Sequence, residues 1–84
     1  MNTKKYPYLA CGDTSGKTFR LFHNGAAEVK GTTHEVLTVF VRMAQMQPCH
    51  LPAHDDFYHA SFINDINAGK YNCAGDAWEI FEVK

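Results

Sequence analysis

The sequence lacks several features that would place it in a familiar class of protein at once. Its three cysteines, Cys11, Cys49 and Cys73, are odd in number and widely spaced, whereas a small secreted domain normally carries an even set joined in disulfides. The amino terminus has Pro7 where a signal peptide needs an unbroken apolar run. No apolar stretch is long enough to predict a membrane-spanning helix. We therefore expect a protein of the reducing cytoplasm that does not enter a membrane.

An excess of charge of one sign is also absent. Eight Lys and Arg residues against nine Asp and Glu residues give a formal net charge of -1. This balance supplies neither the positive field that attracts phosphate backbones nor the dense negative field of a nucleic-acid mimic. The basic residues are scattered along the chain, with no aromatic and basic RNA-binding motif. We expect no direct contact with nucleic acid.

The length of the chain limits what it can contain. Its 84 residues are enough for one small domain and too few for a cofactor domain plus a substrate domain. Hydrophobic residues make up 45% and aromatic residues 13% of the chain, which is typical of a packed core and not of a disordered segment. We expect a single domain over residues 1–84, without a cofactor.

Two strands around a turn form the clearest local pattern. Residues 17–23 and 26–30 flank Asn24-Gly25, a pair typical of hairpin turns. A two-residue loop would place apolar residues opposite charged ones, so the pattern favours a three-residue loop, His23 to Gly25, with Gly25 in the left-handed region of a G1 bulge. The predicted cross-strand pairs are Phe19 with Val29, Leu21 with Ala27, and Arg20 with Glu28.

Two helices are predicted after the hairpin. Thr32 and Glu35 form a capping box that predicts a helix from Thr32 through residue 47. A second helix opens at Pro52 or His54 and continues through Ala68, since Gly69 can supply a left-handed stop.

Two more strands complete the predicted fold. The aromatic residues 5–10 predict an edge strand before the hairpin, and the alternating residues 77–84 predict a final strand. The order βββααβ predicts an α+β fold, in which a small antiparallel sheet carries two helices on one face.

The densest group of potential metal ligands is Cys49, His54, His59 and Cys73. These are residue types that bind zinc in a tetrahedron. Their spacing lacks a Cys-x-x-Cys pair, and the two histidines lie five residues apart, off one helical face. A zinc-binding protein is therefore an alternative to a chain in which the thiols are small core residues and the histidines lie at the surface.

A thiol nucleophile is the other chemistry that these residue types allow. Cys73 with His23 or His59 would need an activating base within hydrogen-bond reach and an oxyanion site. No pattern indicates either, so we expect no catalytic site.

A protein-binding surface is the remaining prediction. If Phe19 and Leu21 face the helices, Phe22 faces the other side of the sheet, and either Trp78 or Phe81 joins it. Such an aromatic patch marks a protein interface or a homodimer seam, unless the N-terminal segment or residues 70–76 cover it. The predicted partner-binding residues are Tyr6, Tyr8, Phe22, Asp55, Asp56 and Trp78. The two aspartates are also explained by the dipole at a helix N-terminus.

The small size, the α+β layout and the near-neutral charge resemble those of inhibitors encoded by phages and mobile elements, notably anti-CRISPR proteins. The segment Trp78-Glu79-Ile80-Phe81-Glu82 is similar to the closing strand of some of them. The resemblance implies stoichiometric binding to a larger bacterial defence protein or CRISPR effector complex, which blocks nucleic-acid binding or activation. It carries over no residue roles. The alternatives are a homodimeric regulatory or structural operon protein and a small zinc-binding protein.

Overall fold

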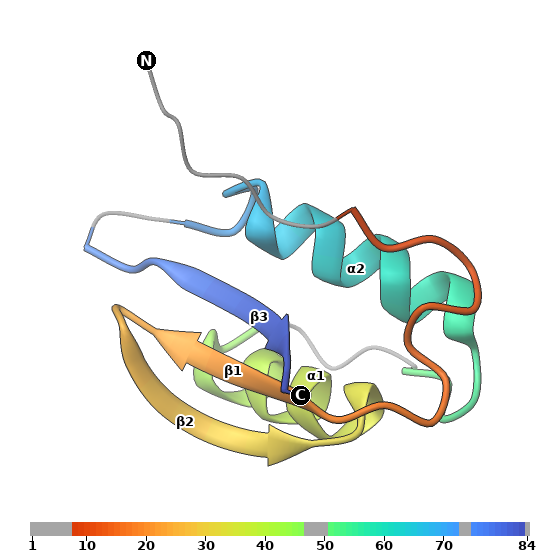
Figure 1. Cartoon of the computed structure of the whole chain (residues 1–84). Helices are drawn as coiled ribbons and strands as arrows, with labels where there is room; N and C mark the ends of the chain where they lie inside the picture. The colour runs from red at the N-terminus through yellow and green to blue at the C-terminus, as the bar shows by residue number, and fades with distance from the viewer. Residues whose placement is uncertain (1–7, 47–50, 73–74, 84) are drawn as a thin grey trace.

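A three-stranded antiparallel sheet and two helices make up the fold (Figure 1). The computed structural model describes residues 8–46, 51–72 and 75–83. In chain order the elements are β1 (Phe19–His23), β2 (Ala26–Gly31), α1 (Thr33–Met43), α2 (Asp56–Asn67) and β3 (Trp78–Glu82). The strands lie in the order β2-β1-β3 across the sheet. The predicted α+β class with an antiparallel sheet is confirmed.

The strand predicted over residues 5–10 is not present in residues 8–10, which form no regular structure, and residues 5–7 lie outside the described residues. Leu9 bonds instead to a helix: its amide donates to Asn64 Oδ1 at 2.9 Å and its carbonyl accepts from Asn64 Nδ2 at 2.8 Å. The backbone of Leu9 is therefore satisfied by a side chain of α2 rather than by a neighbouring strand.

The predicted hairpin register is wrong. Asn24 and Gly25 have φ angles of 54° and 86°, as a two-residue hairpin loop requires. The register shifts after Phe22, so that Glu28 is the additional residue of a β-bulge. A two-residue loop alone would give a poor register. The bulge corrects this register within β2, and the turn keeps two residues. The observed pairs are Phe19 with Gly31, Arg20 with Lys30, Leu21 with Val29, Phe22 with Ala27, and His23 with Ala26.

The capping box at the start of α1 is confirmed. The Glu35 amide donates to Thr32 Oγ1 at 3.2 Å, and the Thr32 amide donates to Glu35 Oε1 at 2.8 Å. The helix ends at Met43, one turn before the predicted residue 47, and Gln45 has a φ of 55°. A left-handed residue cannot continue the helix.

Helix α2 begins later than predicted, because Asp55 is its N-cap. The Asp55 carboxylate accepts a hydrogen bond from the Tyr58 amide at 2.9 Å, as N-cap aspartates commonly do. At the other end Gly69 has a φ of 90°, so its predicted left-handed conformation after the helix is confirmed.

The core lies between the helices and one face of the sheet. Trp78 belongs to it, because its side chain is only 3% exposed and its ring packs edge-on against Phe40 with centroids 5.1 Å apart. The largest fully buried side chains are Phe19, Leu21, Val36, Leu37, Phe40, Ile63, Ile66 and Ile80. Within the described residues, neither helix has the length and apolar character needed to cross a lipid bilayer.

Candidate functional site

The face of the sheet turned away from the helices carries the candidate interaction site. Along β1 and β3 the buried residues alternate with half-buried ones, so the half-buried side chains point to the opposite face. We define the outer sheet surface as Arg20, Phe22, Glu79, Phe81 and Val83. Phe22 pairs with Glu79 and Arg20 pairs with Phe81. The two phenylalanines are therefore diagonal neighbours, with ring centroids 5.9 Å apart and planes inclined by 54°.

Arg20 lies in the middle of the sheet, between an aromatic and a basic neighbour. Phe81 is opposite it on β3, and Lys30 is opposite it on β2. Among the residues that the structure describes, no carboxylate forms an ion pair with Arg20 or Lys30. Aromatic residues, including phenylalanine, and arginine are both enriched at protein interfaces.

The predicted partner-binding residues do not all come together. Phe22 lies on the outer sheet surface, but Trp78 is buried in the core, which corrects its assignment to an exposed patch. Tyr8 is 80% exposed and precedes Leu9, which is bound to α2, so it does not join the outer sheet surface. Tyr6 lies outside the described residues. Phe81 takes the place of Trp78, an alternative that the alternation of the last strand had left open.

Asp55 and Asp56 both bind their own chain. The Asp55 carboxylate caps α2, as described above. The Asp56 carboxylate accepts hydrogen bonds from the Gly12 amide, the Thr14 amide at 2.9 Å and the Thr14 hydroxyl. Thr14 is only 3% exposed. Both aspartates lie at a helix N-terminus, as one interpretation of the sequence had it. The bonds of Asp56 to the loop could not be predicted, because that loop lies more than forty residues away in the chain.

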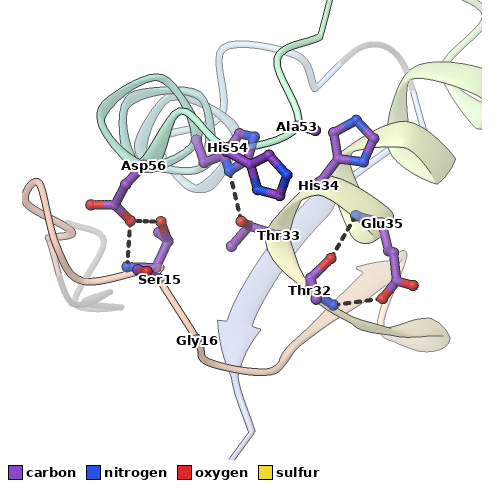
Figure 2. A pocket seen from close by; sticks show the side chains of 11 residues that line it. Ser15, Gly16, Thr32, Thr33, His34, Glu35, Ala53, His54 and Asp56 are labelled. Carbon is purple, nitrogen blue, oxygen red and sulfur yellow. Dashed lines mark hydrogen bonds between the residues drawn. The ribbon is translucent and has the colours of Figure 1, made fainter.

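A cleft of about 370 Å³ lies where the starts of α1 and α2 meet the loop at residues 14–16 (Figure 2). His59 forms part of its wall and is 3% exposed. Its Nε2 lies 2.7 Å from the Pro52 carbonyl oxygen, which can only accept, so Nε2 carries the hydrogen. Nδ1 lies 2.8 Å from the Thr33 hydroxyl oxygen and accepts from it in the neutral ring. Both ring nitrogens of His59 are thus engaged in hydrogen bonds within the chain.

The zinc alternative depends on residues that the structure describes only in part. Cys49 and Cys73 lie outside the described residues. His54 is exposed on the cleft (Figure 2), and His59 has no ring nitrogen left for a metal in this arrangement. In residues 8–46, 51–72 and 75–83 there is no cluster of three or more His, Cys, Asp or Glu side chains placed to hold a metal ion.

The histidines of the thiol hypothesis are also engaged. His23 Nε2 lies 3.0 Å from Asp76 Oδ1, and its ring stacks on Trp78 with centroids 4.0 Å apart. Cys73, the proposed nucleophile, lies outside the described residues. His23 thus has a structural contact at the end of β1.

The outer edge of β3 is closed by asparagine side chains. The Ile80 amide donates to Asn67 Oδ1 at 2.8 Å, and the Ile80 carbonyl accepts from Asn67 Nδ2 at 2.9 Å. The Trp78 amide donates to Asn72 Oδ1 at 3.0 Å. These side chains occupy backbone groups that an added strand would need.

No protein-family model matches the sequence, and neither a curated protein nor a solved structure matches the chain.

Proposed function

We propose that this protein is a small binding module that attaches one-to-one to a larger bacterial protein or ribonucleoprotein through the outer sheet surface. Its action is inhibitory, in the manner of the phage-encoded inhibitors that its scale and layout resemble. It blocks nucleic-acid binding or activation by its target.

The observation that carries the proposal is the pair Phe22 and Phe81 on the face of the sheet opposite both helices. Burying two aromatic rings against a partner removes apolar surface from water at about 25 cal/mol for each Å². Arg20 beside them adds a planar group with five donors that recognises carboxylates. A near-neutral chain gains its affinity from such local contacts and not from a long-range field.

The experiment uses purified effector complexes of bacterial defence systems as candidate targets. Their nucleic-acid binding is titrated with the protein, and an inhibitor of the proposed kind gives an end point at about one protein per complex. Affinity capture from bacterial lysate, with and without added effector complexes, selects the target to be titrated.

Matched variants connect the activity to the surface. We expect F22S to weaken the complex by at least about 30-fold, since a buried aromatic anchor contributes 2 kcal/mol or more. F57S is the control, because Phe57 is 68% exposed on α2, away from the outer sheet surface. Equal binding by the two variants, each shown to be folded by its melting temperature, would contradict the proposal.

A further inference from the structure

The two edges of the sheet differ, and the difference points to contact between copies of this chain. The β3 edge is closed by Asn67 and Asn72, as described above. Strand β2 forms the opposite edge, the lower one in Figure 1, where no described segment lies alongside it. An open edge presents N–H and C=O groups that can pair with another strand.

The backbone of Lys30 faces away from the sheet. The Val83 amide bonds to the Thr18 carbonyl and the Asn24 amide bonds to the Ala77 carbonyl, so the even-numbered residues of β1 bond to β3. The odd-numbered ones, which pair with Val29 and Gly31, then bond to β2. Lys30 lies between Val29 and Gly31, and its N–H and C=O therefore point outward from β2.

The charge pattern of β2 is complementary to itself in one antiparallel register. Glu28 and Lys30 flank Val29, and both charged side chains are exposed. When Val29 of one copy lies opposite Val29 of a second copy, each Glu28 faces a Lys30. Moving the centre by one residue, to Lys30 or to Glu28, slides one strand by two residues relative to the other and places Lys30 opposite Lys30 or Glu28 opposite Glu28. Like charges directly opposite one another destabilise a sheet.

An unfavourable contact within the chain supports the same register. Arg20 and Lys30 lie directly opposite each other on β1 and β2, and like charges in that position are destabilising. In the Val29-centred register, Glu28 of the second copy lies beside Lys30. Its carboxylate would offset the repulsion between the two basic side chains.

We infer that the chain forms a twofold homodimer by antiparallel pairing of β2 with β2 of a second copy, centred on Val29. The result is a continuous six-stranded sheet, and the outer sheet surfaces of the two copies lie on the same side of it. The β-bulge at Glu28 keeps the ladder short. We therefore expect a weak dimer, with a dissociation constant between about 10 µM and 1 mM. The inference does not depend on the target proposed above.

The test is sedimentation equilibrium of the full chain and of E28K, K30E and E28K/K30E at concentrations that bracket this range. Each single substitution makes both cross-copy pairs repulsive, and we expect the dissociation constant of the dimer to rise by about 30-fold. The double substitution restores both pairs and therefore the wild-type dissociation constant. An equimolar mixture of E28K and K30E is expected to form a heterodimer, since every Lys then faces a Glu.

Melting temperatures show that each variant is folded, because exposed charge changes of this kind alter stability by about 0.5 kcal/mol or less. A wild-type chain that stays monomeric at 1 mM overturns the inference. A dimer that the single substitutions leave unchanged also overturns it, since association would then use another surface. Failure of both the double variant and the mixture to dimerise shows that Glu28 does not face Lys30, and rejects the register.

Discussion

Asp55 and Asp56 are adjacent, carry the same charge and have different structural roles, which makes them a matched pair for a stability experiment. Asp56 accepts three hydrogen bonds, two from Thr14 and one from Gly12. A hydrogen bond to a charged group contributes about 1.5–3 kcal/mol net. The carboxylate is partly exposed and the three bonds are not additive. We therefore expect D56A to lower the free energy of unfolding by about 3 kcal/mol and D56N by about 2 kcal/mol.

The control is D55N, because asparagine is as good an N-cap as aspartate, and it is expected to change stability by less than about 0.5 kcal/mol. A chain of 84 residues has a total stability of about 4–13 kcal/mol. D56A should thus remain folded at 25 °C while its melting temperature falls by about 12–24 °C. Urea denaturation measures the free energies, and hydrogen exchange at the Thr14 amide reports the loop. Equal effects of D56N and D55N would refute the assigned role of Asp56.

Two further predictions concern the backbone. G31A would place a Cβ against the Glu35 carboxylate of the capping box, and we expect a loss of about 1 kcal/mol, measured by urea denaturation. The loss should shrink in an E35A background, and an unchanged loss there would show that the carboxylate is not responsible. N67D replaces the amide that bonds both backbone groups of Ile80 with a carboxylate that cannot donate. We expect thermal unfolding to report a loss of about 2 kcal/mol, against almost none for the exposed control S61A. Equal melting temperatures for N67D and S61A would contradict this role of Asn67.

Local patterns in the sequence predicted the parts of the fold that depend on neighbouring residues. The capping box needs only Thr32 and Glu35, which are three residues apart, and it forms as predicted. The left-handed Gly69 after α2 is of the same kind. The end of α1 was placed too late, because Gln45 adopts a left-handed conformation that helix propensity does not indicate.

The register of the hairpin could not be predicted from local patterns alone. The sequence indicated that a plain two-residue loop would set apolar residues opposite charged ones. It did not indicate whether the additional residue would lie in the turn or in the strand. Both solutions restore the apolar pairing, and in this chain Glu28 bulges from β2 while Val29 meets Leu21. The choice decides which charge lies opposite Arg20, so it also changes the prediction for the surface.

The candidate surface could be predicted only in outline for a similar reason. Alternation in the last strand required Trp78 and Phe81 to face opposite sides of the sheet. Which of them is buried depends on Phe40, whose ring packs against Trp78 from α1. The role of Asp56 depends on a loop that contacts it across the fold. Neither contact can be predicted from the neighbouring residues in the sequence, because each joins residues far apart in the chain.

Three polar side chains of α2 bond to other parts of the chain. Asn64 bonds both backbone groups of Leu9, and Asn67, three positions later, does the same for Ile80. An asparagine side chain can bond to both backbone groups because its amide oxygen accepts and its amide nitrogen donates. The C=O and N–H of a residue in a neighbouring strand do the same. With Asp56 bound to the loop near Thr14, α2 is bonded both to residues 9–14 and to β3, in a chain too short to bury a large core. Asp56, Asn64 and Asn67 are thereby committed within the chain, whereas the contacts proposed for a target and for a second copy use the outer sheet surface and the β2 edge.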